Sequence, residues 1–294
     1  MANQNVYPYG TGGGLPSGVV IKSCYLSYSS GAMNIFLPAN NGLLKYVFEH
    51  DVDASKNADI WRIEYVALCN SIGAEMKTIT VHGEWEAAIL LHNRADFSGG
   101  ILHGDEVLSN ISFFADGQLV NISRDISCLY FNELRILQTS TMYDPNDSTT
   151  PIATHTSEHL FTKDGLTINQ SLEWLVDTGV TNSYMAMFPV AKAVTSSYCT
   201  DKDYTPQAIP SSPNVTIPGV RSINIWSDSA RVFCVFGVGN YRGLDDSKMR
   251  LLISDNNGDN VYNKCYFYLN DADGTTVNVG DVWKTTTFYK IFAE

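Results

Sequence analysis

The feature of this 294-residue chain that most constrains its fold is a succession of short runs of β-branched and aromatic residues. From Val19 onward, runs such as VVIKSCYLSYSS, ISFFADGQLVNI and VYNKCYFYL are separated by Gly, Asn, Asp and Pro. This pattern is typical of strands in β-sandwiches and barrels. No long segment repeats apolar residues at a helical period, and the best helical candidates are the short stretches 58–66 and 125–134. The sequence therefore predicts an all-β fold, a two-sheet antiparallel sandwich of jelly-roll type with few short helices.

Three dipeptides predict where neighbouring strands turn back on each other. They are Asp116-Gly117, Asp164-Gly165 and Asn257-Gly258, and each lies between two strand-like runs. Asp-Gly and Asn-Gly pairs adopt the positive φ angles that tight hairpins require. Each pair therefore predicts an antiparallel hairpin.

The chain divides into an arm and one domain. Residues 1–18 are rich in Gly, Pro, Asn and Tyr without periodicity, so we expect a flexible N-terminal arm or linker. Residues 19–294 are expected to form a single β-sandwich, since sandwiches of this length often form one domain. Within it, residues 196–218 are rich in Ser, Thr, Asp and Pro and predict a long loop, of the kind that often carries function.

Composition narrows the partners and the cysteine chemistry. The formal charge of −12, without a cluster of Lys and Arg between aromatic residues, argues against nucleic acid as a partner. No run of about 18 apolar residues is present, so no membrane insertion is expected. The six cysteines lie far apart without CxxC pairs, which favours reduced, buried thiols and a cytosolic folding compartment; disulfides stay an alternative.

Titratable residues concentrate in the middle of the chain, where five of the six histidines fall between positions 82 and 159. Alternate side chains of a strand share one face. Three groups are thereby placed on common faces: His82 with Glu84 and Glu86, His103 with Asp105, and His155 with Ser157 and His159. If these strands are neighbours, imidazoles and carboxylates converge in one groove. The alternative for each histidine is a solvent-facing position on the polar side of a half-buried sheet.

Two chemistries suit such a face. Imidazole and carboxylate ligands from His103, Asp105, Glu106, His155 and His159 suit a divalent Zn, Mn or Fe ion. Their spacing matches no established metal signature such as HExxH, so no ligand set and no cofactor is assigned. In the second chemistry, His and Tyr act as base and acid in β-elimination on an acidic polysaccharide, while Arg, Asn or Gln neutralises the uronate carboxylate.

Residues 79–118, which include HGEWEAAILLH and ILHGDE, and residues 155–190, which include HTSEHLFTKDGLTINQSLEW, resemble domains of phage tail fibres and tailspikes. They are also broadly similar to jelly-roll polysaccharide lyases. The chain lacks the RxExR, QxH and YxxxGxYxQ motifs of alginate lyases.

This resemblance implies a carbohydrate-active domain of a phage tail protein that depolymerises an acidic bacterial surface polysaccharide by β-elimination. The alternatives are a non-catalytic receptor-binding head that recognises a host glycan or protein, and a structural virion module. The implied catalytic residues are His103, His155, His159, Tyr184 and Arg94. The implied substrate-binding residues are His82, Glu84, Glu86, Asp105, Glu106, Asn169 and Gln170. The implied setting is a homotrimer in the virion tail, made in the host cytoplasm and associated with other tail proteins.

Overall fold

We describe the fold from a computed structural model. It describes residues 23–81, 83, 85, 87–210, 214–241, 249–254 and 261–294. The predicted arm at 1–18 and the predicted Asn257-Gly258 hairpin lie outside the described residues. So do three predicted substrate-binding residues, His82, Glu84 and Glu86.

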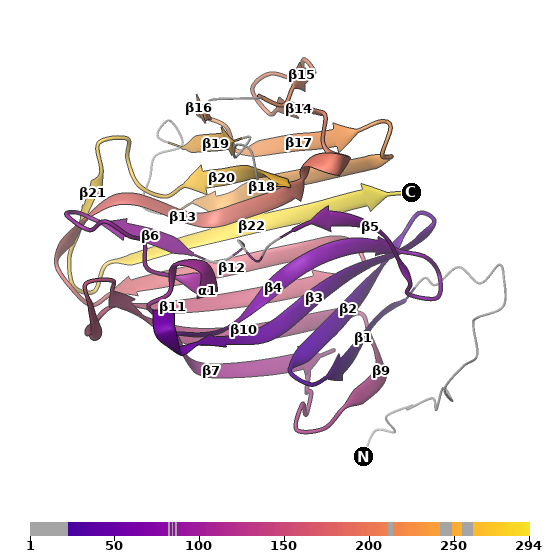
Figure 1. Ribbon diagram of the computed structural model, residues 1–294, viewed down its shortest axis with the longest axis horizontal. Helices are drawn as coiled ribbons and strands as arrows, with labels where there is room; N and C mark the ends of the chain where they lie inside the picture. Colours follow the sequence, from indigo (N-terminus) through magenta and orange to yellow (C-terminus); the bar gives the residue numbers. More distant parts are fainter. Residues whose placement is uncertain are drawn as a thin grey trace.

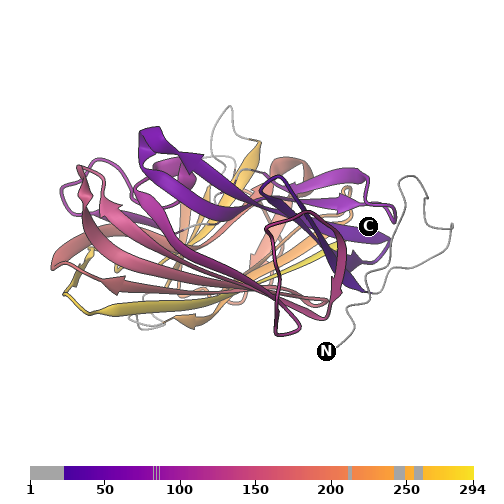
Figure 2. The same ribbon diagram turned by 90° about the horizontal axis from the view of Figure 1, so that it is seen from below.

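The strands form one hydrogen-bonded network that folds into two facing layers (Figures 1 and 2). Neighbours in layer I are, in order, β8 (Gln118–Leu119), β7 (Glu106–Ala115), β10 (Glu133–Asp144), β11 (Asp147–Thr162), β12 (Gly165–Trp174), β22 (Val282–Ala293), β18 (Val232–Tyr241), β17 (Ser222–Ser227), β14 (Ser197–Thr200) and β15 (Gln207–Ala208).

Layer II holds the remaining strands. Its neighbours are, in order, β9 (Ile126–Phe131), β1 (Cys24–Ser29), β2 (Ala32–Ala39), β3 (Gly42–Asp53), β4 (Ala58–Cys69), β5 (Glu75–Thr80), β13 (Thr178–Ala191), β20 (Tyr262–Tyr268), β19 (Arg250–Ser254) and β16 (Val215–Pro218). Two short strands, β6 (Ala88–Leu91) and β21 (Thr275–Val277), also pair with β13. A parallel pairing of β4 with β7 joins the layers. Helix is confined, in the described chain, to α1 (Gly100–His103), η1 (Ala54–Lys56) and η2 (Lys192–Val194).

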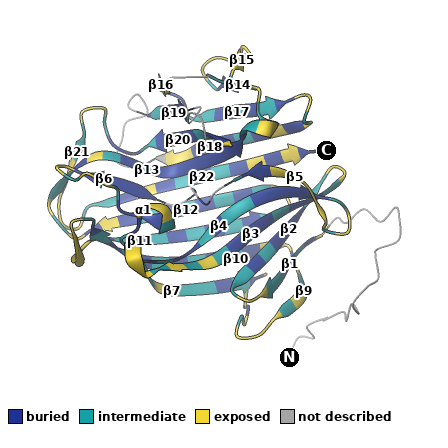
Figure 3. Cartoon of the chain, viewed as in Figure 1, coloured by how far each residue is buried: buried dark blue, intermediate teal, exposed yellow. Residues whose placement is uncertain are grey.

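The core lies between the layers because alternate residues of each strand point inward. Burial alternates along β10, β12 and β22, as the mixed colours of these strands show (Figure 3). Large side chains from both layers meet there, and Phe161 of β11, Phe188 of β13 and Phe236 of β18 are fully buried. Each such side chain contributes about 1.5–3 kcal/mol through burial.

These observations confirm the predicted all-β antiparallel sandwich with few short helices. Asp116 and Gly117 have φ angles of 49° and 76° and connect β7 to β8. The Asp164-Gly165 hairpin connects β11 to β12, with Thr162 opposite Gly165. The two predicted hairpins that lie within the described residues are therefore present.

The two predicted helices and the long loop were wrong. Residues 58–66 belong to β4 and 125–134 mostly to β9 and the start of β10, since pairing with β3 and β1 outweighs weak local helical preference. Residues 196–218 contain the short strands β14, β15 and β16. All six cysteines are free thiols, and five of them are buried. None of the helices in the described part of the chain is long and apolar enough to cross a membrane.

Candidate functional site

A row of polar side chains crosses the inner face of layer I. Gln138, Ser157, Gln170 and Thr285 lie directly opposite one another on β10, β11, β12 and β22. All four are buried and point between the layers. Gln138 accepts a hydrogen bond from the backbone N–H of Trp61 on β4, at 2.8 Å, so the row also binds the facing layer. The sandwich therefore has a polar centre, although its core is otherwise apolar.

A hydrogen-bonded chain runs beside this row. The Nδ1 atom of His155 lies 2.8 Å from Oε1 of Glu106, and its Nε2 atom lies 3.0 Å from Oε1 of Gln170. The other end of the Gln170 amide, Nε2, donates to the carbonyl oxygen of Met185 at 2.6 Å. Glu106 also accepts from the Ser140 hydroxyl at 2.5 Å and from the Gly100 backbone N–H at 2.7 Å. We call Glu106, His155 and Gln170 the buried chain.

The donors and acceptors fix the protonation of the buried chain. A backbone carbonyl only accepts, so the amide nitrogen of Gln170 faces Met185 and its oxygen faces His155. Glu106 accepts from the Gly100 backbone N–H and the Ser140 hydroxyl, and its pKa is lowered, so we assign it as ionised. His155 then has acceptors on both ring nitrogens, and donates from both as an imidazolium.

The pKa values of the pair agree with this assignment. Burial alone would lower the pKa of His155, but the charge of Glu106 and the hydrogen bonds to Glu106 and Gln170 outweigh it, and the pKa is raised. Burial alone would raise the pKa of Glu106, but the charge of His155 and the hydrogen bonds from His155, Ser140 and Gly100 lower it overall. The pair is thus a buried ion pair in which each charge supports the other.

His159 lies next to the buried chain in a different state. Burial, together with the charge of His155, lowers the pKa of His159 to about 3, so its ring is neutral. The ring packs edge-on against Phe48, with centroids 5.2 Å apart, and its Nδ1 atom has no hydrogen-bond partner among the described residues. His155 and His159 border a cavity of about 20 Å³ that Trp61 and Trp85 also line. A cavity of this volume holds about one water molecule.

A second, larger recess lies on the outer side of layer II. It has a volume of about 230 Å³. Its walls are Phe97, His103, Tyr184, Lys264 and Tyr266, its floor is formed by Ala88, Met187 and Leu252, and Asn214 and Ser254 add polar groups. We call this recess the aromatic groove. None of its described lining residues is acidic, in contrast to the net charge of −12 for the whole chain.

The rings of the aromatic groove contact one another in series. Phe97 lies between His103 and Tyr184, with ring centroids at 4.9 Å and 6.1 Å. Tyr184 contacts Tyr266 at 5.3 Å. Burial, followed by a hydrogen bond to Tyr268, raises the pKa of Tyr184, so its hydroxyl stays protonated. The imidazole of His103 is about two-fifths exposed and lies 3.7 Å from the carboxylate of Asp96.

Glycines shape the wall that carries His103. Residues 99–105, which we call the α1 turn, close on themselves through hydrogen bonds from Gly99 N to Gly104 O and from Gly104 N to Gly100 O. Gly104 has a φ of +91°, and a Cβ atom there would lie 2.3 Å from the carbonyl oxygen of Lys56. Asp105, in turn, donates its N–H to the same Lys56 oxygen at 2.8 Å. Only glycine fits this close approach, and the chain turns here. The prediction that His103 and Asp105 share one face of a strand was therefore wrong, since His103 lies in α1 and Asp105 has a φ of 56°.

A β-bulge shapes the wall that carries Tyr184. Opposite β20, the pairing of β13 shifts between Tyr184 and Ala186, which leaves Met185 as the extra residue. Bulges are common beside active sites because they redirect a side chain. The Met185 side chain is in the core, whereas Tyr184 points to the groove.

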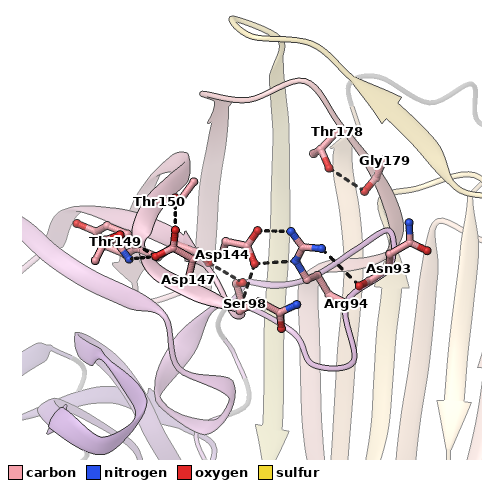
Figure 4. Close-up of polar contacts among 11 residues, drawn as sticks. Asn93, Arg94, Ser98, Asp144, Asp147, Thr149, Thr150, Thr178 and Gly179 are labelled. Atoms are coloured by element: carbon pink, nitrogen blue, oxygen red, sulfur yellow. Dashed lines mark hydrogen bonds and ion pairs between the residues drawn. The ribbon is translucent and has the colours of Figure 1, made fainter.

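Arg94 lies neither at the cavity beside the buried chain nor at the aromatic groove. Its guanidinium forms two hydrogen bonds to the carboxylate of Asp144, at 2.7 Å and 2.5 Å, near Asp147 and its threonine contacts (Figure 4). Hydrogen bonding to Arg94 lowers the pKa of Asp144. Arg94 thus fastens the turn after β6 to the end of β10, and it is not among the residues that line either recess.

The predicted site residues therefore separate into several groups. The buried chain and its cavity bring together Glu106, His155, His159 and Gln170, while the aromatic groove brings together His103 and Tyr184. Asn169 points to the outer face of layer I, where it donates to Glu158 at 2.9 Å. Asp105 is half-buried, and its carboxylate lies 3.4 Å from the Asn57 amide. The alternative that His155 and His159 face solvent on the polar side of a sheet was wrong, because both are buried. Glu106 makes burial of the His155 imidazolium possible, whereas His159 is buried with a neutral ring.

Sequence reasoning missed Phe97, Lys264 and Tyr266. The alternation in YNKCYFYL carries a signal for the last two, because Cys265 and Phe267 face the core and leave Lys264 and Tyr266 on the other side. Phe97 lies in a loop and carried no such signal.

One acidic cluster has the geometry of a cation site. Carboxylate oxygens of Glu49, Asp51 and Glu64 lie within 4.8 Å of one another. Arg62 already pairs with Asp51 and with Glu64, both at 2.5 Å. The guanidinium therefore supplies the positive charge that this cluster requires.

Comparisons with known proteins concern the fold. No family model and no curated protein matches the chain. Among solved structures, a galactose mutarotase-like protein from Clostridium acetobutylicum aligns over 93% of this chain and 99% of its own, with a TM-score of 0.48 and 8% identity. A protein from Escherichia coli K12 named as an aldose 1-epimerase aligns over 88% and 99%, with a TM-score of 0.43 and 9% identity. A protein from Synechocystis sp. PCC 6803 aligns over 95% and 100%, with a TM-score of 0.34 and 7% identity.

These comparisons correct the prediction from sequence. The likeness extends over nearly the whole chain to β-sandwiches of the galactose mutarotase-like type, so the resemblance to phage tail fibres, tailspikes and jelly-roll lyases was wrong. The predicted depolymerisation of an acidic polysaccharide by β-elimination was wrong with it, as were the virion-based alternatives. At such low identities the likeness concerns the fold alone.

Proposed function

We propose that the protein binds a saccharide in the aromatic groove and acts on it by acid–base chemistry. The observation that carries the proposal is the groove itself, which places aromatic rings and hydrogen-bonding side chains around one open recess of about 230 Å³. Ligand sites are typically concave and mostly apolar, with a few polar groups that orient the ligand. Phe97 and Tyr184, which are half-buried, offer ring surface to the C–H face of a sugar, while the buried Tyr266 packs behind Tyr184 and supports it. Lys264, Asn214 and Ser254 offer partners for the sugar hydroxyls.

Two groups at the groove suit proton transfer. His103 is accessible and lies near Asp96, which favours an oriented imidazole. Burial and a hydrogen bond to Tyr268 raise the pKa of Tyr184, which keeps its hydroxyl protonated but makes it a weaker acid than an ordinary tyrosine. The same hydroxyl accepts from the Asn182 amide at 3.0 Å. For an aldose, His103 would take the proton of the anomeric hydroxyl while Tyr184 gives its proton to the ring oxygen. The bond between the anomeric carbon and the ring oxygen then breaks, and reclosure on the other face returns both protons.

Binding is tested first, with aldohexoses, hexuronates and disaccharides titrated by calorimetry and saturation-transfer NMR. Tyr266→Ala and Phe97→Ala each remove one ring of the groove, and we expect each to raise the Kd about tenfold. Tyr130→Ala is the matched control, since Tyr130 is an exposed tyrosine on β9, outside the groove. Absence of binding by every sugar, or equal loss in the control, would overturn the proposal.

Catalysis is tested separately by NMR exchange between the two anomers of each sugar that binds. We expect acceleration over the rate in buffer, and His103→Gln should remove most of it while the Kd changes by less than about threefold. Binding without acceleration would overturn the catalytic half of the proposal and leave saccharide binding in place. A preference for hexuronates that Lys264→Met abolishes would identify Lys264 as the carboxylate partner.

A further inference from the structure

We infer that the buried chain, Glu106, His155 and Gln170, positions the two walls of the aromatic groove from inside the sandwich. None of the three touches the groove. They are positioning residues, and the inference concerns the shape of the groove whatever ligand it takes. Only the affinity measurement below rests on the proposed function.

One end of the buried chain holds the wall that carries His103. Oε2 of Glu106 accepts from the backbone N–H of Gly100, the first residue of α1, at 2.7 Å. His103 is the last residue of α1. Glu106 itself follows the α1 turn directly and begins β7, where it is 1% exposed. The carboxylate thus ties the start of α1 to the strand that leaves it, and a short turn with several glycines receives a fixed conformation.

The other end holds the wall that carries Tyr184. The β-bulge makes Met185 the extra residue of β13, opposite β20. The amide of Gln170 donates to the Met185 carbonyl oxygen at 2.6 Å. Because buried backbone carbonyls require a partner, the side chain of a core residue satisfies the bulge that turns Tyr184 outward.

His155 joins the two ends. It donates to Glu106 from one ring nitrogen and to Gln170 from the other, so neither neighbour can change orientation without leaving a buried donor or acceptor unpaired. A buried ion pair adds little net stability compared with apolar packing, but it can select one geometry. The geometry selected here includes both walls of the groove.

Hydrogen exchange tests the inference without any sugar. In Gln170→Met the bulge carbonyl loses its donor, and we expect amides of residues 183–187 to exchange about fivefold faster. Amides of the α1 turn, which Gln170 does not touch, should also exchange faster. Glu106→Gln should give the reciprocal result, with faster exchange at the α1 turn and at the bulge. The inference would be overturned if Gln170→Met accelerated exchange only at residues 183–187 and Glu106→Gln accelerated it only at the α1 turn.

Thr285→Val is the matched control. Thr285 lies directly opposite Gln170, is equally buried, and its hydroxyl has no hydrogen-bond partner among the described residues. This substitution should leave exchange unchanged at both walls, and an equal effect would indicate a general loss of packing and overturn the inference. If Gln170→Met does not fold, Gln170→Glu keeps an acceptor for His155, whose positive charge favours the ionised carboxylate, and replaces the donor to Met185 with an acceptor oxygen. It should accelerate exchange at residues 183–187, and no change there would also overturn the inference.

Affinity supplies the second readout. If the groove binds a saccharide, Gln170→Met should raise the Kd by about fivefold or more, and Thr285→Val by less than about twofold. An unchanged Kd in Gln170→Met, with sugar binding intact in the parent, would overturn the positioning role. If the protein binds no sugar, the proposed function is wrong, but the hydrogen-exchange experiment still tests the positioning role of the buried chain.

Discussion

The buried chain and the aromatic groove both contain histidine, yet they differ in what surrounds it. His155 is enclosed by hydrogen-bond partners in the interior, beside a cavity with room for about one water molecule. His103 stands in an open recess of about 230 Å³, where its imidazole is about two-fifths exposed. The first histidine is fixed in one protonation state, whereas the second has access to solvent and to a ligand.

This difference shows that a concentration of titratable groups has two distinct uses in one fold. In the interior, every group of the buried chain is committed to a partner, and the result is a defined geometry. In the groove, aromatic surface and accessible polar groups coexist, and the result is a surface suited to a ligand. The pKa is perturbed at His155 in the interior and at Tyr184 in the groove, so a perturbed pKa alone does not identify a ligand site. Accessibility to solvent is what distinguishes the groove from the buried chain.

The largest expected difference between the buried chain and the aromatic groove is in stability, when one charge of the Glu106–His155 pair is removed. Glu106→Leu leaves the imidazolium of His155 without its anion, and we expect the free energy of unfolding to fall by about 3–5 kcal/mol, as measured by urea denaturation. His103→Gln, at the accessible histidine, should leave it nearly unchanged. A similar small loss in both variants would contradict the distinction between scaffold and site.

The pH dependence of stability gives the next largest effect, and it comes from His159. Its pKa is about 3 in the folded protein and 6.5 ordinarily, so between these values the unfolded chain binds a proton that the folded chain does not. Stability should therefore fall as the pH decreases, by about 1.4 kcal/mol per pH unit well inside this window. Urea denaturation between about pH 5 and pH 6 should show this slope, and His159→Phe should remove most of it.

The contributions of His155 and Glu106 change mainly outside the measured range of pH 5 to pH 6. The raised pKa of His155 means that its contribution is present below its ordinary pKa and is lost as the pH rises through the raised value. The lowered pKa of Glu106 means that its contribution is lost only as the pH falls below the ordinary carboxyl range. A slope that persists in His159→Phe would show that another group dominates.

The sequence predicted those parts of the molecule that depend on local geometry. The two-residue period correctly placed His155, Ser157 and His159 on one face, because side chains alternate in any strand. It did not predict that this face is the interior, since that depends on Glu106, which lies 49 positions away along the chain. The sequence also did not predict that His103 and His155 lie in different places. The strand expected around His103 is absent, because the chain forms the α1 turn, where Gly104 lies close to the Lys56 carbonyl oxygen.

A third effect tests whether the shape of the α1 turn controls the groove. Gly104→Ala places a Cβ atom against the Lys56 carbonyl oxygen, and we expect a loss of about 1–3 kcal/mol in unfolding free energy. Saccharide affinity in the groove should also fall. Gly117→Ala is the control, because Gly117 also has a positive φ, +76°, but has nothing within 4 Å of the new atom. Equal loss of affinity in both variants would contradict a local role for the turn.

The smallest effect is expected at Arg94, which was predicted to be catalytic. Its ion pair with Asp144 is half-buried: the Asp144 side chain is 11% exposed and the Arg94 side chain 29%, so solvent and salt screen it more than the fully buried pair of Glu106 and His155. Arg94→Gln should shift the urea midpoint only slightly, and less at high salt, while saccharide affinity changes by less than about twofold. Glu106→Leu should be far more damaging, although both variants remove one partner of an ion pair. A large, salt-independent loss in Arg94→Gln would show that burial of the pair is not what distinguishes the interior from the surface.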